Sequence, residues 1–156
     1  MIEYKSNQDI FKSKVDAIVN TVNCIGVMGA GLAKEFKKRY PEMYREYRKK
    51  CENNKLKIGK LHVFRTIDKL IINFPTKIHW KDNSKLEWIK AGLNYFVTNY
   101  KKWNITSVAF PQLGTSHGKL NWNDVKPLME KYLNSLDIDV EIYVRSDEKC
   151  FQNDNI

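Results

Sequence analysis

Short, almost continuous apolar runs recur along the chain, and helix-type segments separate them. The runs occupy residues 17–19, 61–64, 70–74, 107–110 and 140–144. Runs of this kind are typical of strands that are covered on both faces of a sheet. Because strands and helices alternate, the sequence predicts an α/β fold, a three-layer α/β/α domain around a largely parallel or mixed central sheet. In such sheets, ligands bind beyond the carboxyl ends of the strands.

Four segments have helical spacing or helix-end signals. They occupy residues 31–40, 42–50, 84–100 and about 122–136. Pro41 ends the first helix and can begin the second. Ser84 and Glu87 have the spacing of a capping box, which predicts that the third helix begins there. Leu86 is then expected on the same buried face as the apolar residues that follow it at helical spacing.

Length and composition exclude several classes of protein. The 156 residues fit one domain at 1–146, followed by a polar tail at 147–156 that we expect to be frayed. No apolar run is long enough to span a membrane, and three cysteines without a C-x-x-C pair argue against disulfides and a zinc site. We therefore expect a cytoplasmic monomer without a metal or cofactor.

The net charge of +9 comes from 27 basic and 18 acidic residues. Such an excess suits an anionic partner, including nucleic acid, because lysine and arginine neutralise phosphates. On charge alone, solubility is the favoured interpretation.

A glycine-rich loop follows the first predicted strand. It carries Asn20 and Asn23, and then Gly26, Gly29 and Gly31 directly before a helix. Glycines let a ligand approach the backbone closely, and a helix N-terminus offers N–H groups to a phosphate. The spacing alone supports an anion cradle and a ligand-free turn about equally.

A second loop of similar character, residues 112–120, follows another predicted strand. It contains the run Gly114, Thr115, Ser116, His117 and Gly118. Glycines and hydroxyls suit a second cradle of backbone donors for an anion. On the residues alone, His117 is more simply interpreted as a solvent-facing side chain.

A third loop places Lys77 after the apolar run 70–74, with His79 and Trp80 close by in the sequence. A partly desolvated lysine at a strand end could act as a nucleophile with a lowered pKa, or stay charged and stabilise an anion. Trp80 and Trp88 could contact an unstacked base, although tryptophan more often packs in or near a core.

Taken together, these motifs resemble the macrodomains, a family that binds ADP-ribose. The resemblance covers about residues 2–145 and rests on residues 7–10, on residues 15–23 and on the two glycine-rich loops. Within the family, residues 20–33, 73–77 and 120–122 look like the DarG-type antitoxin macrodomains, which remove ADP-ribose from thymidine bases in DNA. These are similar to terminal ADP-ribose glycohydrolases that use a catalytic lysine.

The resemblance implies roles for individual residues. Asp9 would accept a hydrogen bond from the adenine amine, Asn23 would hold the distal ribose, and Lys77 would act at its anomeric carbon. With His79, Asn23 and Lys77 form the implied catalytic set. The implied ligand-binding residues are Asp9, Ile10, Asn20, Gly29, Ala30, Gly31, Gly114, Thr115, Ser116, His117, Gly118 and Tyr143.

The chain also departs from the family pattern. Ser116 and Lys119 stand at two positions where the family has glycine, and Gly118 stands where some lysine-type relatives carry an aspartate. The identity of the general acid or base therefore remains open, with His79 as the first candidate and His117 as the second.

The implied activity is an ADP-ribosyl glycohydrolase, with ADP-ribose or ADP-ribosylated DNA as ligand and an ADP-ribosyltransferase toxin as a partner. The alternatives are a hydrolase of ADP-ribosylated protein, a reader that binds ADP-ribose without turnover, and a basic DNA-binding module. The last has no recognisable DNA-reading motif to support it.

Overall fold

The computed structural model describes residues 1–145, and the predicted tail at 147–156, with the expected boundary at 146, lies outside them. Six strands form a single sheet in the order β1-β6-β5-β2-β4-β3. The strands are β1 (Ile2–Ser6), β2 (Ala17–Val22), β3 (His62–Arg65), β4 (Leu70–Pro75), β5 (Ser107–Pro111) and β6 (Asp139–Val144). Only β3 runs antiparallel to its neighbour, so the predicted mixed sheet is confirmed.

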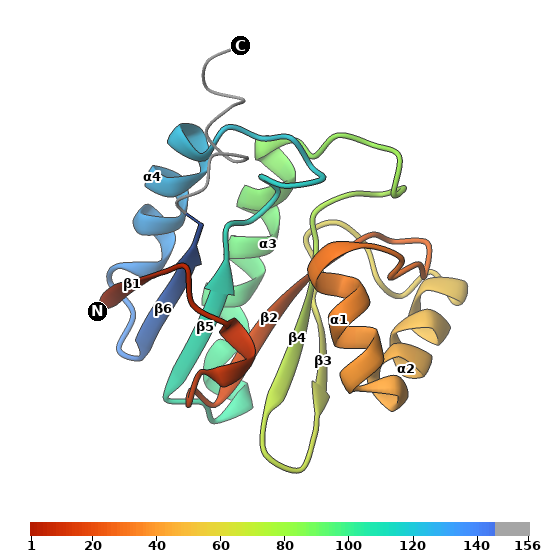
Figure 1. Cartoon of the computed structure of the whole chain (residues 1–156), viewed down its shortest axis with the longest axis horizontal. Coiled ribbons are helices and arrows are strands. Elements are labelled where there is room, and N and C mark those ends of the chain that lie inside the picture. Colours follow the sequence, from red (N-terminus) through yellow and green to blue (C-terminus); the bar gives the residue numbers. More distant parts are fainter. Residues whose placement is uncertain (146–156) are drawn as a thin grey trace.

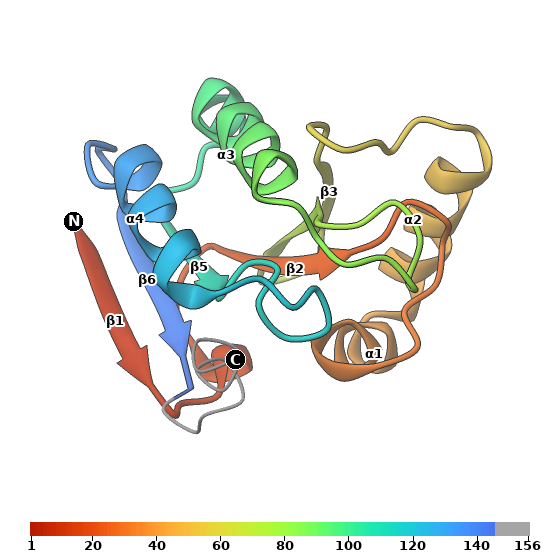
Figure 2. The ribbon, with the colours of Figure 1, turned by 90° about the horizontal axis from the view of Figure 1, so that it is seen from above.

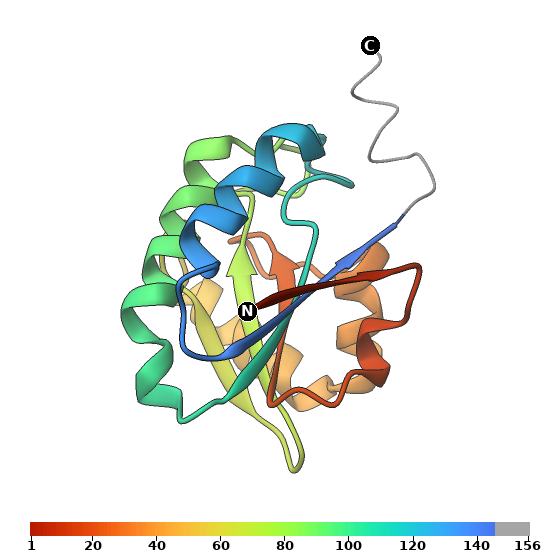
Figure 3. The same cartoon turned by 90° about the vertical axis from the view of Figure 1, so that its left-hand side faces the viewer.

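Helices cover both faces of the sheet, as Figures 2 and 3 show. They are α1 (Gly31–Arg39), α2 (Pro41–Glu52), α3 (Leu86–Asn99) and α4 (Trp122–Leu133), with short 3-10 helices at Ile10–Lys12 and Tyr100–Trp103. The pair α1 and α2 packs on one face, and the pair α3 and α4 packs on the other. The three-layer α/β/α architecture is confirmed.

Two separate apolar clusters fill the spaces between the layers. Side chains alternate along β2, so Val19 joins the cluster beneath α3 and α4, while Ile18 joins the cluster beneath α1 and α2. Both side chains are fully buried. This two-sided burial explains why the central strands read as continuous apolar runs.

Three details differ from the sequence-based expectations. The edge strand β1 was not predicted, because Glu3 and Lys5 alternate with its partly buried apolar residues. Helix α3 is capped by Lys85 without a side-chain hydrogen bond, so the predicted capping box is wrong; the backbone N–H of Ser84 instead donates to the carbonyl of Gly118. Leu86, expected to be buried, is 39% exposed.

Because β2, β4, β5 and β6 are parallel, their carboxyl ends meet at one edge of the sheet (Figure 1). The loops that follow β2, β4 and β5 are the three that the sequence singled out. The fold therefore gathers them in one place.

Within residues 1–145, no helix is long and apolar enough to cross a membrane. Over the same residues, no group of three or more histidine, cysteine or acidic side chains could hold a metal ion. Cys24 and Cys51 are free thiols. Burial raises the pKa of each to about 11, which keeps both thiols protonated near neutral pH.

Candidate active site

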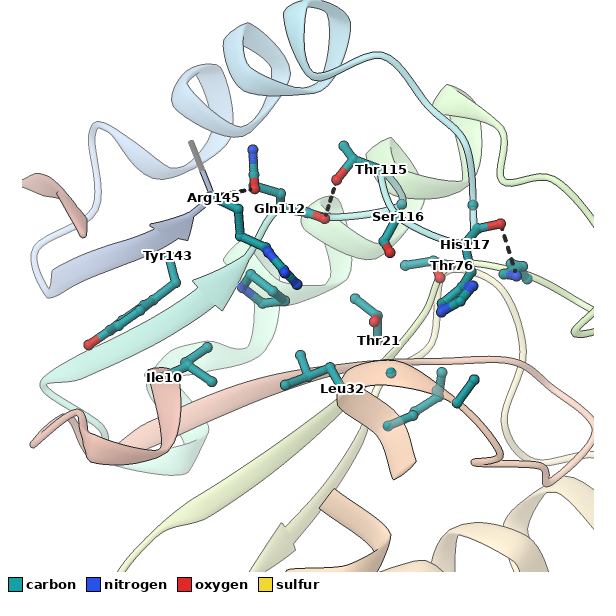
Figure 4. Close-up of a pocket in the computed structure, with 18 of the residues that line it drawn as sticks. Ile10, Thr21, Leu32, Thr76, Gln112, Thr115, Ser116, His117, Tyr143 and Arg145 are labelled. Carbon is teal, nitrogen blue, oxygen red and sulfur yellow. Dashed lines mark hydrogen bonds between the residues drawn. The ribbon is translucent and has the colours of Figure 1, made fainter. Parts of the chain in front are cut away.

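A cavity of about 720 Å³ lies at the carboxyl edge of the sheet. The β2–α1 loop and the loop after β5 line its two sides. One end is formed by the 3-10 helix at Ile10–Lys12 and the end of β6, and the other by Lys77 and Trp80. Figure 4 shows side chains from these segments converging on the space between them.

Asn23 holds the β2–α1 loop in shape. Its Oδ1 accepts hydrogen bonds from the backbone N–H groups of Ile25 (3.1 Å) and Val27 (3.3 Å), and its Nδ2 donates to the carbonyl of Val27 (2.8 Å). The buried hydroxyl of Tyr47 donates to the Asn23 carbonyl at 2.8 Å. Asn23 lines the cavity as expected, but its amide is engaged within the loop.

Gly29, Ala30 and Gly31 line the cavity where α1 begins. The first N–H groups of a helix lack intrahelical partners and carry a partial positive charge, so this position suits an anion. Gly31 has φ +56°, and a Cβ there would lie 3.2 Å from Nε2 of His117, on the opposite loop. Glycine therefore keeps the passage between the loops open.

The loop after β5 curls back on itself. The backbone N–H of Leu120 donates to the carbonyl of Gly114 (2.9 Å), and the hydroxyl of Thr115 donates to the carbonyl of Gln112 (3.1 Å). Residues 114–118 all line the cavity. Gly118 has no room for a side chain, because a Cβ would collide with Oγ of Ser84. The aspartate of some lysine-type relatives would not fit here without a shift of Ser84.

Lys77 follows β4, and its side-chain nitrogen, Nζ, lies between two backbone carbonyls. Nζ donates to the carbonyl of Trp80 at 3.0 Å and to that of His117 at 3.3 Å. Partial burial lowers the pKa of Lys77 from its ordinary value, and the charge of Lys119 adds to this, while Asp82 opposes it. The site thus favours the neutral amine more than solvent does.

The opposite end of the cavity combines apolar and hydrogen-bonding groups. Asp9 caps the short 3-10 helix, accepting a hydrogen bond from the N–H of Phe11 at 2.9 Å, and Ile10 is buried beside it. Tyr143 lies across from Ile10, and its hydroxyl donates to Glu141 at 2.9 Å. This end of the cavity therefore offers apolar surface beside a carboxylate, a combination typical of small-molecule sites.

Asn20 and His79, two of the expected site residues, do not line the cavity. Asn20 is fully buried within β2, and its Nδ2 donates to Oδ1 of Asn73 on β4 at 3.0 Å. The sequence could not show that the amide of this asparagine is engaged by the neighbouring strand. The Nδ1 atom of His79 accepts a hydrogen bond from the N–H of Lys81 at 3.1 Å. This nitrogen is therefore engaged within its own loop.

The cavity also contains residues that the sequence reading did not assign. Most of them stand at the ends of strands, a position that could have pointed to them. They include Gln8, Thr21, Val22, Thr76, Pro111, Gln112, Val144 and Arg145. The backbone N–H of Arg145 donates to Oε1 of Gln112 at 3.0 Å, which ties the end of β6 to the loop after β5.

This arrangement, a six-stranded mixed sheet with a cavity between two glycine-rich loops, matches a known family. The chain belongs to the macro domain family, whose profile matches residues 19–129. The resemblance seen in the sequence is thereby confirmed.

Two relatives of the chain carry the same protein name. The chain is 47% identical over 148 residues to a DNA ADP-ribosyl glycohydrolase of Mycobacterium tuberculosis, covering 92% of this chain and 42% of that protein. It is 37% identical over 140 residues to the protein of the same name from Thermus aquaticus, covering 87% and 39%. The chain thus spans about two-fifths of the length of these curated relatives.

Solved structures of related proteins have the same fold as the chain. The macrodomain of Mycobacterium tuberculosis DarG superposes with a TM-score of 0.88 at 45% identity, covering 92% of this chain and 97% of that one. Thermosipho africanus DarTG in complex with ADP-ribose superposes with a TM-score of 0.85 at 37% identity, covering 90% and 40%.

Proposed function

We propose that this chain is an ADP-ribosyl glycohydrolase that removes ADP-ribose from thymidine bases in DNA, with Lys77 as the catalytic lysine. The observation that carries the proposal is the position of Lys77, at one end of a cavity between two anion-suited loops and with a lowered pKa. The likeness to DNA ADP-ribosyl glycohydrolases supports the substrate class.

ADP-ribose would lie along the cavity. Adenine would occupy the end with Asp9, Ile10 and Tyr143, where a ring can pack and an exocyclic amine can donate to a carboxylate. The diphosphate would lie between the first turn of α1 and the loop at 114–118, both of which offer backbone N–H groups. The distal ribose would then reach Lys77.

The neutral form of Lys77 has two N–H bonds and one lone pair. The carbonyls of Trp80 and His117 can accept both N–H bonds, which leaves the lone pair for the anomeric carbon. Nζ would form a bond to that carbon while the bond to the base breaks and the base leaves with the electron pair. Water would then replace Nζ at that carbon and give a proton back to the group that protonated the base, which releases ADP-ribose and restores the neutral amine.

The departing base needs a proton. Among the described cavity-lining side chains, His117 is a titratable group beside Lys77, whereas Asp9 lies at the adenine end and His79 does not line the cavity. This favours His117 over His79 as the proton donor. We expect His117→Ala to slow release of ADP-ribose more than His79→Ala does.

We extend the proposal to partners and location. A Thermosipho africanus fusion of a DNA ADP-ribosyl transferase with a DNA ADP-ribosyl glycohydrolase is 36% identical to the chain over 155 residues. This supports a functional pairing with an ADP-ribosyltransferase toxin whose modification this protein reverses. Such a role requires a cytoplasmic location, and we expect the domain to act as a monomer.

The test compares release of ADP-ribose from an ADP-ribosylated thymidine oligonucleotide and from ADP-ribosylated protein. Lys77→Ala should abolish release while free ADP-ribose still binds. The matched control is Lys69→Ala, because Nζ of Lys69 also donates to a backbone carbonyl, that of Val15, but outside the cavity. If the wild type binds ADP-ribose but releases it from neither substrate, the chain is a module that binds ADP-ribose without turnover. If it releases ADP-ribose from protein alone, the substrate is ADP-ribosylated protein and not DNA.

A further inference from the structure

Exposed apolar side chains gather beside the Lys77 end of the cavity. Of the seven large hydrophobic side chains that are exposed within residues 1–145, four lie on the β2–α1 loop and the β4–α3 loop: Ile25, Val27, Ile78 and Trp80. The N–H of Cys24 donates to the carbonyl of Ile78 at 2.9 Å, so the two loops adjoin. Apolar groups concentrated at a rim, rather than scattered singly, mark a binding surface.

Trp80 is the aromatic member of this group, and it also lines the cavity. Its side chain is 49% exposed, although tryptophan usually buries most of its large surface. His79 covers part of the ring at a centroid distance of 5.2 Å, and Nζ of Lys81 lies 5.2 Å from the ring centroid. Because Trp80 is about half exposed even with these neighbours, part of its ring surface stays accessible at the mouth of the site.

The loop that carries Trp80 is held by several hydrogen bonds. The carbonyl of Trp80 accepts from Nζ of Lys77, and the N–H of His79 donates to Oδ2 of Asp82 at 2.9 Å. The N–H of Asp82 donates back to the carbonyl of His79 at 3.0 Å. The backbone that carries the indole is thus held in place, which lowers the entropy lost when a flat ligand stacks on the ring.

The direction of the bound ligand decides what meets this ring. If the distal ribose lies at Lys77, the group attached to its anomeric carbon leaves the cavity past Trp80. The surroundings are cationic, because Lys81 and Lys119 are both exposed nearby and Lys119 acts electrostatically on Lys77. A half-exposed aromatic ring among lysines suits a nucleobase with its phosphates better than an acidic protein segment.

We infer that the thymine carrying the ADP-ribose stacks on the exposed indole of Trp80, which makes Trp80 a specificity-determining residue for the nucleobase side of the substrate. The inference rests on the proposed function for the direction of ADP-ribose in the cavity. Since the base must present its face, it has to be unstacked from its neighbours in the strand.

The experiment measures kcat/KM on a single-stranded oligonucleotide with one ADP-ribosylated thymidine. Trp80→Ala should lower it about 10- to 100-fold, the range expected for loss of one base–aromatic stack. Trp80→Phe should keep most of the activity. The matched control is Trp88→Ala. Nζ of Lys85 lies 5.1 Å from the ring centroid of Trp88, much as Lys81 lies near Trp80, but Trp88 does not line the cavity.

Affinity for free ADP-ribose separates stacking from a structural role. That ligand has no base on its distal ribose, so Trp80→Ala should leave its Kd within about twofold. Unchanged kcat/KM in Trp80→Ala would overturn the inference, and so would an equal loss of free ADP-ribose affinity. If the wild type does not cleave the oligonucleotide, the proposed function fails, and the dependence of oligonucleotide Kd on Trp80 still decides the inference.

Discussion

Gly118 offers the sharpest test of how the loop after β5 is built. A Cβ at this position would collide with Oγ of Ser84 and with the carbonyl oxygen of Gly114. Neither atom moves freely, since Ser84 is buried and its N–H donates to the carbonyl of Gly118 at 2.9 Å, while the Gly114 carbonyl accepts from the N–H of Leu120. Gly118→Ala therefore forces the loop to shift.

Overpacking of this kind costs about 1–3 kcal/mol. For a domain of this size that corresponds to a fall in Tm of roughly 3–10 °C. Because residues 114–118 line the cavity, the shift should also weaken ADP-ribose binding. Gly118→Asp, which introduces the carboxylate of some lysine-type relatives, should be at least as destabilised.

Thermal denaturation and calorimetric titration with ADP-ribose measure both effects. Ser84→Gly in the Gly118→Ala background should recover part of the lost stability, because it removes one of the two collisions and leaves the Gly114 carbonyl. Ser84→Gly alone is the control for the loss of the serine side chain. A Gly118→Ala protein with wild-type Tm and wild-type affinity would refute the account of this loop.

Two further predictions concern buried polar groups. Tyr47→Phe removes the hydroxyl that donates to the carbonyl of Asn23, so the free energy of unfolding should fall by about 1–2 kcal/mol and ADP-ribose should bind more weakly, as denaturation and calorimetry would reveal. Burial lowers the pKa of His62, whose side chain bridges Glu46 and Asn73. As pH falls, His62 takes up a proton in the unfolded state before it does so in the folded state. The contribution of neutral His62 to the free energy of unfolding is therefore full above about pH 6.5 and declines as pH falls toward the lower folded-state pKa. The drop in Tm between pH 7 and 5 should be smaller in His62→Gln, and an unchanged drop would show that other groups dominate.

Much of the fold could be predicted from the sequence because its central strands are buried on both faces. Five apolar runs correspond to strands β2 to β6, and Pro41 does stand where one helix follows another. The edge strand β1 gave no such signal, since the charged residues Glu3 and Lys5 alternate with its partly buried apolar residues. The Ser84 spacing was misleading because the backbone there bonds to a distant loop, at Gly118.

Site residues that follow the ends of strands could be predicted from the sequence. Whether a residue within a strand faces the cavity depends on the direction of its side chain, which was harder to predict. Lys77 and the two glycine-rich loops meet as expected, because parallel strands bring their carboxyl ends together. Asn20 differs because side chains alternate along a strand, and its amide points to Asn73 rather than to the cavity. Arg145 was missed because only the fold brings the end of β6 next to the loop after β5.

The central claim is that Lys77 acts as a neutral nucleophile, and the pH dependence of single-turnover release of ADP-ribose from a modified thymidine oligonucleotide tests it most directly. Because burial lowers the pKa of Lys77 below its ordinary 10.5, the rate in the His117→Ala background, where loss of the donor's proton cannot affect the profile, should rise with pH and level off at a pKa under that value. Lys77→Arg, which stays charged, should lose release at every pH while still binding ADP-ribose. Release by Lys77→Ala or Lys77→Arg at the wild-type rate, or a His117→Ala rate that falls as the amine deprotonates, would contradict the account.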